Sequence, residues 1–234
     1  LVILNLKQAL KLSIPMILPW CLGVIFLQFV RPYEAVSRYD FGNIFAVGAL
    51  FGVVLSIGLV WTAVGWHRYV LLEDRGSGVL PRFHSQLFPY IWRSLALGLS
   101  LGLIFALASA LTGSLGFSVG GIWLSMLLLF VVGALLNWSF YLLSPILPAA
   151  ALGKKMTFAE AWDYTEDFAG SIAIVALCYF ALGYILEYFV DFVGALLPTV
   201  VYFGLLGIVS WLLAMLGISL LTTIYGVAVE NREL

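Results

Sequence analysis

Apolar residues occur along this chain in six long runs that are separated by short polar segments. A helix needs about 20 residues to cross the hydrocarbon core of a bilayer, and each run approaches or exceeds that length. The runs predict transmembrane helices at about Ser13–Val30, Ile44–Trp66, Ser94–Leu111, Ile122–Ser144, Ser171–Phe189 and Val200–Tyr225. We therefore expect an all-α polytopic membrane bundle of six transmembrane helices, with residues 1–234 forming a single transmembrane domain.

Two polar segments between or before these runs are typical of short amphipathic helices at the membrane surface. Near the start of the chain, Lys7 and Lys11 lie one helical turn apart within an apolar background, which indicates an interfacial helix leading into the first span. Thr157 followed by Glu160 forms the pattern of a capping box, which predicts that a second short helix begins there.

Because the chain begins with Leu1 rather than Met, we expect its natural start to lie upstream.

The second short helix has one face of apolar or small residues, and its acidic residues lie on the other faces. The apolar face carries Phe158, Ala161, Trp162 and Thr165. The acids are Glu160, Asp163, Glu166 and Asp167, which we interpret as a solvated face rather than as acid and base pairs.

The basic residues are distributed unequally between the two sides that a six-span topology defines. One side holds nine cations and the other holds two, Arg31 and Arg38. The nine are Lys7, Lys11, Arg68, Arg75, Arg82, Arg93, Lys154, Lys155 and Arg232. Because Lys and Arg near span ends are retained on the cytoplasmic side, this asymmetry predicts that both termini are cytoplasmic.

The composition favours lipid as the main solvent of this chain. Hydrophobic residues make up 63% and charged residues 10% of its 234 residues, and the mean hydropathy is +1.10. Too few charges are present to cover a soluble domain of this size. The net charge of −1 and the scattered cations also give no basic patch, so nucleic acid is not an expected partner.

Small residues recur at every fourth position in the third predicted span, and this is the clearest spacing in the sequence. The ladder consists of Ser94, Gly98, Gly102, Ala106 and Ala110, and the second span carries Gly48, Gly52 and Ser56. Such spacing lets another helix backbone approach closely. We favour packing between helices of this chain, with a partner protein or a second copy as the alternative.

Polar side chains inside the predicted spans are few. Asn137 in the fourth span and Gln28 near the end of the first need hydrogen-bond partners in lipid, so both should face other helices. No charged residue or histidine lies well inside any span, which disfavours proton relays and ion coupling. Prolines near span ends indicate an ordinary bundle with broken ends, although discontinuous helices around a substrate remain the alternative.

The residues that could support chemistry do not form a recognisable motif. His67 and His84 are the only histidines, and both fall near Glu73 and Asp74. Their spacing lacks the geometry of a metal site, and we interpret them as interfacial side chains, with pigment or haem ligation as a further alternative. The two cysteines fall in apolar runs and are not expected to form a disulfide. We therefore predict no enzyme activity, no metal and no cofactor.

The segments VGWHRYVLLEDRGSG and LSPILPAAALGKKMTFAEAWDYTEDFAG resemble corresponding segments of uncharacterised bacterial polytopic inner-membrane proteins. These are loosely similar to the membrane domain that some bacteria fuse to glycerophosphodiester phosphodiesterases. The resemblance is carried by Trp66, Arg68, Gly153, Ala161, Trp162 and Thr165. It implies a helical bundle in a bacterial inner membrane and provides no catalytic residue to transfer.

These observations lead to two hypotheses from different classes. The first is a non-catalytic accessory or scaffold protein that associates with a larger membrane complex, with lipids or with a second copy. The second is a facilitator or lipid-handling transporter without ion coupling, with a polar path near Asn137. A closed bundle favours the first hypothesis, whereas a groove or chamber favours the second.

Overall fold

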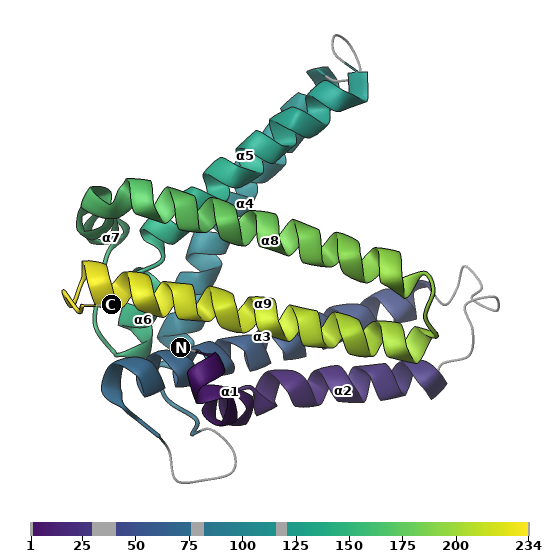
Figure 1. The fold of residues 1–234 in the computed structure, drawn as a ribbon, viewed down its shortest axis with the longest axis horizontal. Coiled ribbons are helices and arrows are strands. Elements are labelled where there is room, and N and C mark those ends of the chain that lie inside the picture. Colours follow the sequence, from purple (N-terminus) through teal and green to yellow (C-terminus); the bar gives the residue numbers. More distant parts are fainter. Residues whose placement is uncertain (1, 30–40, 76–81, 116–120, 234) are drawn as a thin grey trace. The chain divides into compact units, whose positions relative to one another are not determined.

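The fold is that of a computed structural model, which describes residues 2–29, 41–75, 82–115 and 121–233 (Figure 1). These residues form helices and connections, with no β-strand among them. The helices in chain order are η1 (Ile3–Asn5), α1 (Leu6–Leu12), α2 (Ile14–Phe29), α3 (Phe41–Leu72), α4 (Leu87–Leu115), α5 (Gly121–Leu143), α6 (Ile146–Ala151), α7 (Phe158–Thr165), η4 (Glu166–Phe168), α8 (Ala169–Gly194) and α9 (Thr199–Ala228).

Five of the helical segments are individually long and apolar enough to cross a membrane. They are Ala46–Leu72, Leu87–Ser114, Gly121–Ala151, Phe158–Gly194 and Thr199–Ala228. A sixth is reached if residues 3–12 and 14–25, which are bent by 68° relative to each other, count as one span. The prediction of a polytopic helical membrane protein is therefore confirmed, while the number six stays a prediction.

The 16 residues of α2 that the structure describes extend about 24 Å at 1.5 Å per residue, against roughly 30 Å of hydrocarbon. By contrast, α3 continues past the predicted end at Trp66 to Leu72, and α4 begins at Leu87 rather than at Ser94. Hydropathy marks where a span leaves lipid, whereas a helix continues as long as its backbone bonds do.

The described chain divides into two compact units, which we treat separately. The first unit comprises Leu1–Leu87 and Ile185–Ser219, and the second comprises Phe88–Tyr184 and Leu220–Leu234. Long helices α8 and α9 each contribute to both units. The prediction of one transmembrane domain over residues 1–234 stays a prediction.

In the first unit, α2 packs along α3. Small residues allow this approach: a side chain at Gly58 would clash with the backbone of Pro15, and one at Gly23 would clash with the Phe51 ring. At the start of α2, the buried Ser13 hydroxyl donates to the Ala9 carbonyl at 2.7 Å.

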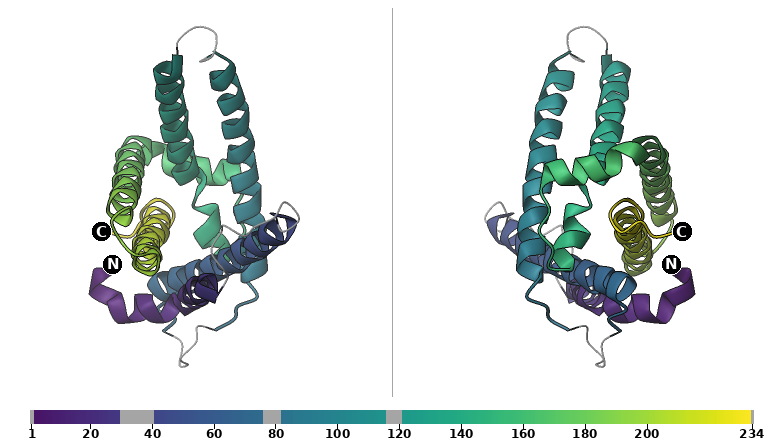
Figure 2. Two further views of the ribbon diagram at one scale, coloured as in Figure 1. Left: turned by 90° about the vertical axis from the view of Figure 1, so that its right-hand side faces the viewer. Right: turned by 90° about the vertical axis from the view of Figure 1, so that its left-hand side faces the viewer.

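In the second unit, α4 and α5 run side by side in opposite directions (Figure 2). Near the end of α4 and the start of α5, the Ser125 hydroxyl donates to the Thr112 carbonyl at 3.2 Å. At their other ends, Arg93 of α4 donates to the carbonyls of Ile146 and Lys154 at 3.0 and 3.2 Å, which attaches α4 to α6 and the turn after it.

The contact between α5 and the first part of α8 is held by polar side chains as well as by rings. The Asn137 amide donates to the Ala176 carbonyl at 2.8 Å, and the Trp138 indole donates to the Ala169 carbonyl at 3.1 Å. The expectation that Asn137 faces another helix is thus confirmed. Gln28, for which we expected the same, has a side chain outside the described residues.

The short helix α7 begins with the predicted capping box. The Glu160 N–H donates to the Thr157 hydroxyl at 3.2 Å, and the Thr157 N–H donates to the Glu160 carboxylate at 2.7 Å. On the predicted apolar face, Ala161 and Thr165 are buried and Phe158 and Trp162 are exposed. Thr165 also donates to the Leu142 carbonyl at 3.0 Å, so α7 packs on α5, while its position at a membrane surface stays a prediction.

Replacing Asn137 by Leu should lower the thermal stability of the detergent-solubilised protein. A side-chain hydrogen bond between membrane helices contributes about 0.6 kcal/mol on average and up to about 1.7 kcal/mol. The matched control is Ser139→Ala on the same helix, because the Ser139 hydroxyl donates to the Leu135 carbonyl of its own helix at 2.9 Å. Thermal unfolding of both variants tests the prediction, which fails if they shift the melting temperature equally.

Candidate functional site

An apolar groove with a volume of about 740 Å³ lies within the first unit, between α2, α3 and α9. Binding sites for small molecules commonly have volumes between roughly 300 and 1,000 Å³. Its walls are formed by aliphatic and aromatic side chains, among them Met16 and Val24 of α2, Leu55 and Leu59 of α3, and Ile208 of α9. Leu10 of α1 also lines the groove.

Small residues on one face of α9 explain why the groove is open. Gly204, Gly207, Ser210 and Ala214 all line it, and this spacing of three or four residues keeps them on one side of a helix. A side chain at Gly204 would meet no atom within 4 Å, so space lies directly beside it. A side chain at Gly207 would clash with the Trp20 indole, which packs directly on this glycine.

Two indole N–H groups are the unusual polar atoms of the groove. Trp20 of α2 and Trp211 of α9 both line it, and the Nε1 atom of each is buried without a hydrogen-bond partner among the described residues. Ser56 also lines the groove, but its hydroxyl donates to the Gly52 carbonyl of its own helix at 2.8 Å. A molecule in the groove therefore meets mainly hydrocarbon.

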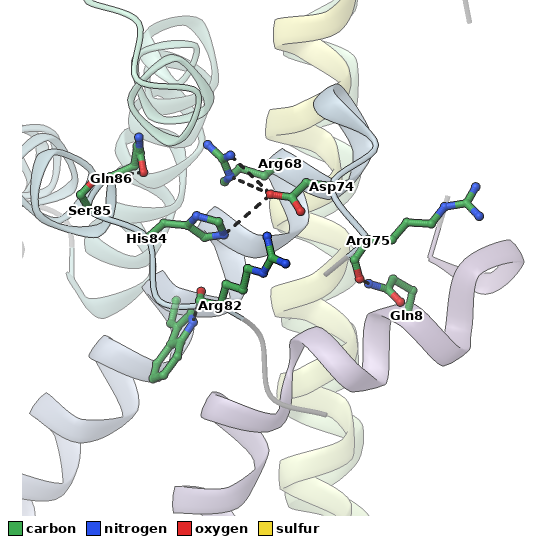
Figure 3. A network of polar contacts seen from close by, with 9 residues as sticks. Gln8, Arg68, Asp74, Arg75, Arg82, His84, Ser85 and Gln86 are labelled. Carbon is green, nitrogen blue, oxygen red and sulfur yellow. Dashed lines mark hydrogen bonds and ion pairs between the residues drawn. The ribbon is translucent and has the colours of Figure 1, made fainter. Parts of the chain in front are cut away.

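A network of polar contacts lies outside the groove and joins residues of α3 to residues that come after it in the chain (Figure 3). The Asp74 carboxylate accepts from the Arg68 guanidinium at 3.3 and 3.4 Å, and the His84 Nε2 atom lies 3.9 Å from the same carboxylate oxygen. The Trp61 indole donates to the Arg82 carbonyl at 3.1 Å. Side chains from before and after the segment that joins α3 to α4 are thereby held together.

The end of α3 is shaped by its backbone. Glu73 has a positive φ of 56°, and the Asp74 N–H donates to the Arg68 carbonyl at 3.3 Å. A residue in this left-handed conformation followed by such a bond terminates helices and satisfies a carbonyl that would otherwise lack a partner. The termination directs Asp74 back toward Arg68 and so makes the network possible.

His84 titrates below its usual range in this network. Burial lowers the pKa of His84, the positive charges of Arg68 and Arg82 lower it further, and the negative charge of Asp74 opposes them. The imidazole is therefore held in its neutral form near neutral pH.

The two histidines of the sequence do not come together as a site. His67 is completely buried within α3, as is its neighbour Trp66, and its predicted position at the membrane interface stays a prediction. Among the described residues no group of three His, Cys, Asp or Glu side chains is close enough to hold a metal. Cys21 and Cys178 are both free thiols.

The small-residue ladder of α4 does not contact another described helix at its glycines. Gly98, Gly102, Ala106 and Ala110 are exposed, and Ser94 is half-buried. Side chains added at Gly98 or Gly102 would meet no atom within 4 Å, and the same holds for Gly48 and Gly52 of α3. The structure gives no support to packing within the chain at these four glycines, and a partner contact stays a prediction.

Apart from Ser56 and Cys21, the residues that line the groove were not among those singled out from the sequence. The small residues of α9 are three or four positions apart, so a search for strict fourth-position spacing, which identified the α4 ladder, does not find them. Comparisons of this chain with protein-family models, with curated proteins and with solved structures found no match. The resemblance to bacterial inner-membrane proteins accordingly stays a prediction.

Acidification should loosen the connection between α3 and α4. Because the pKa of His84 is lowered in the fold, an opened chain binds a proton more readily, so the stabilisation is complete above the ordinary value of about 6.5 and is lost as the pH falls through the lowered pKa. Hydrogen exchange at residues 82–87, corrected for intrinsic rates, should become faster below about pH 6.5.

His84→Gln supplies the control for this pH effect, since it removes the titrating group. The variant should show exchange that no longer accelerates with acidification in this window. The same acceleration in the variant as in the native chain would contradict the assignment to His84.

Proposed function

We propose that this chain is a lipid-handling membrane protein that holds a hydrocarbon chain in the groove of the first unit. The observation that carries the proposal is the groove itself, which is apolar, about 740 Å³ in volume and lined by helices of membrane-spanning character. The sequence left a scaffold and a lipid-handling protein as alternatives, and a groove is the feature that favours the latter.

The length of the groove fits one leaflet of a bilayer. Its wall on α9 runs from Gly204 to Ala214, and ten residues of helix extend about 15 Å. This is about half of the roughly 30 Å hydrocarbon thickness. A lipid chain that enters from one leaflet would therefore find apolar wall along most of its depth.

The walls of the groove are aliphatic and aromatic, which suits a hydrocarbon chain. Hydrocarbon in close contact with the walls also recovers dispersion energy that an empty groove would forgo.

Asn137 plays a different part from the one that a polar transport path would require. Its amide donates to the Ala176 carbonyl, so it joins α5 to α8 within the second unit. This favours handling of an apolar molecule over a facilitator with a polar path at Asn137.

A second candidate function is that of an accessory protein, and the exposed face of α4 favours it. Gly98, Gly102, Ala106 and Ala110 offer a shallow surface with open space beside both glycines, which suits the close approach of a partner helix or a second copy. The two functions are compatible, because the face of α4 belongs to the second unit and the groove belongs to the first.

We place the protein in a bacterial inner membrane with six spans and both termini in the cytoplasm. The nine-to-two distribution of cations supports the orientation, and the even number of spans agrees with it. Counting α1 and α2 as one bent span provides the sixth crossing.

Filling the groove should abolish lipid retention. Gly204→Phe places a ring in the open space beside α9, and the loss of two buried methylene contacts at about 0.8 kcal/mol each already corresponds to more than about tenfold in affinity. Native mass spectrometry of the purified protein with added phosphatidylcholine measures the bound fraction. The matched control is Gly102→Phe, which adds the same ring at an open position of α4.

Two results would contradict the lipid-handling proposal. One is unchanged phosphatidylcholine retention by the Gly204→Phe variant. The other is an equal loss of retention in the Gly102→Phe control, which would assign the effect to added bulk on any helix.

Gly102→Leu tests the second candidate function. Because a side chain at Gly102 meets no described atom within 4 Å, the free energy of unfolding of the isolated protein should stay within about 0.5 kcal/mol of the native value, with little change in melting temperature. Proteins or second copies that copurify after mild extraction should instead be lost. A clear drop in melting temperature would show that the ladder packs within the chain, and retained partners would exclude this face as their contact.

A further inference from the structure

The exposed surface of the short helix α7 is divided into an aromatic side and an acidic side. Phe158 is 40% exposed and Trp162 is 46% exposed, and residues four apart share one side of a helix. The acids Glu160 and Asp163 are also exposed, and Tyr164 is exposed next to Glu160. At 3.6 residues per turn, the centre of the two acids lies about 150° around the helix from the centre of Phe158 and Trp162.

The remaining side of α7 is buried against α5, which fixes the directions in which the other two sides point. Ala161 and Thr165 are buried, and the Thr165 hydroxyl donates to the Leu142 carbonyl of α5 at 3.0 Å. The capping box of Thr157 and Glu160 holds the first turn. The aromatic side therefore faces one defined direction in the second unit.

The axis of α7 lies across the start of α8. In Figure 1, α8 runs across the view and α7 is seen nearly end-on beside its first residues, and in the views of Figure 2, turned by 90°, α7 is seen from its side. The 26 residues of α8 extend about 39 Å, so this helix crosses roughly 30 Å of hydrocarbon without α7. A helix that lies across the end of a span runs along the membrane surface.

The candidate span that precedes α7 ends close to the same level. It comprises Gly121–Ala151, and the buried side of α7 packs on α5 within it. The Trp138 indole of α5 also donates to the Ala169 carbonyl, at the first residue of α8, at 3.1 Å. Two spans thus meet α7 at the point where each of them ends or begins.

The two sides of α7 match the two layers of a bilayer surface. An amphipathic helix at this level buries its apolar rings at the boundary between headgroups and acyl chains and keeps its charges in water. Tryptophan is enriched at this boundary because its ring is apolar and its N–H is a hydrogen-bond donor. The opposite orientation is unfavourable, since it would bring carboxylates into hydrocarbon.

We propose that α7 is an interfacial helix, with Phe158 and Trp162 inserted into the bilayer surface and with Glu160 and Asp163 in the water. Its partner is the boundary between the headgroups and the acyl chains of phospholipids. Because α7 is bonded to α5 and joined to α8, its insertion fixes the depth at which these two helices cross the membrane. α7 belongs to the second unit, so this role is independent of the groove.

Spin labels on the two exposed sides of α7 test this orientation. Phe158→Cys and its matched control Asp163→Cys are made separately in a full-length chain in which the free thiols are removed by Cys21→Ala and Cys178→Ala. Each labelled protein is reconstituted in phosphatidylcholine bilayers. Electron paramagnetic resonance then measures collisions of the label with oxygen, which dissolves in lipid, and with a water-soluble nickel chelate.

We expect the label at residue 158 to collide mainly with oxygen and to lie about 5–10 Å below the headgroup surface. The label at residue 163 should collide mainly with the nickel chelate. Nickel collisions that are equally frequent at both positions would place α7 in water and overturn the proposal. Few collisions with either reagent at residue 158 would also overturn it, because protein rather than lipid would then cover the aromatic side.

A second measurement leaves Phe158 in place. Phospholipids that are brominated near their ester groups should quench the tryptophan fluorescence of the native protein more strongly than that of the Trp162→Phe variant, which keeps an apolar ring. Equal quenching of the two proteins would contradict insertion of Trp162. Phosphatidylcholine retention by the Trp162→Phe variant should equal that of the native protein, so the result for α7 and the result for the groove are obtained separately.

Discussion

Peptide groups that lie in hydrocarbon have no water with which to form hydrogen bonds, and the rest of this structure depends on that constraint. Each long helix satisfies its own backbone, and several hydroxyls within the helices also donate to carbonyls of their own helix. Thr62 donates to the Gly58 carbonyl and Ser100 to the Ala96 carbonyl, each four residues earlier on its own helix. Asn137 is different because its amide reaches from α5 to α8. The indole N–H groups of Trp20 and Trp211 are exceptions to this rule. Both residues line the groove, and each N–H is buried without a hydrogen-bond partner among the described residues.

Because lipid is as apolar as the helix surfaces, close packing rather than hydrophobicity has to hold the helices together. Small residues serve this purpose in two distinct ways. At Gly58 and Gly207 the missing side chain is replaced by atoms of a neighbouring helix, so the glycine brings two elements together. At Gly102 and Gly204 no described atom occupies the space, so the glycine leaves a surface or a groove open. The spacing of small residues is the same in both situations, and only the tertiary structure distinguishes them.

This distinction explains how far the sequence could predict the molecule. Apolar runs located the long helices, and the pattern of Thr157 and Glu160 located the start of α7, because both depend on residues that are near each other in the chain. The ends of the helices α3 and α4 could not be predicted from hydropathy, since backbone bonding continues after hydropathy falls. The burial of His67 against other parts of the fold could not be predicted either, because it depends on tertiary contacts. The groove could not be predicted, because it depends on which face of α9 meets Trp20, and that pairing joins residues almost two hundred positions apart.

The break between α1 and α2 connects the charge pattern of the sequence with the groove. In a continuous helix the Lys11 carbonyl would accept from the N–H of residue 15, but Pro15 has no N–H and its ring disfavours the helical path. The chain bends by 68° between these helices, and the Ser13 carbonyl accepts from the N–H groups of Met16 and Ile17 to start α2. Lysines before the bend are thereby separated from the apolar residues after it. Met16 and Trp20 then line the groove, while Lys7 and Lys11 stay on α1. Pro15 thus divides an amphipathic segment into a helix that carries the lysines and a helix that is apolar.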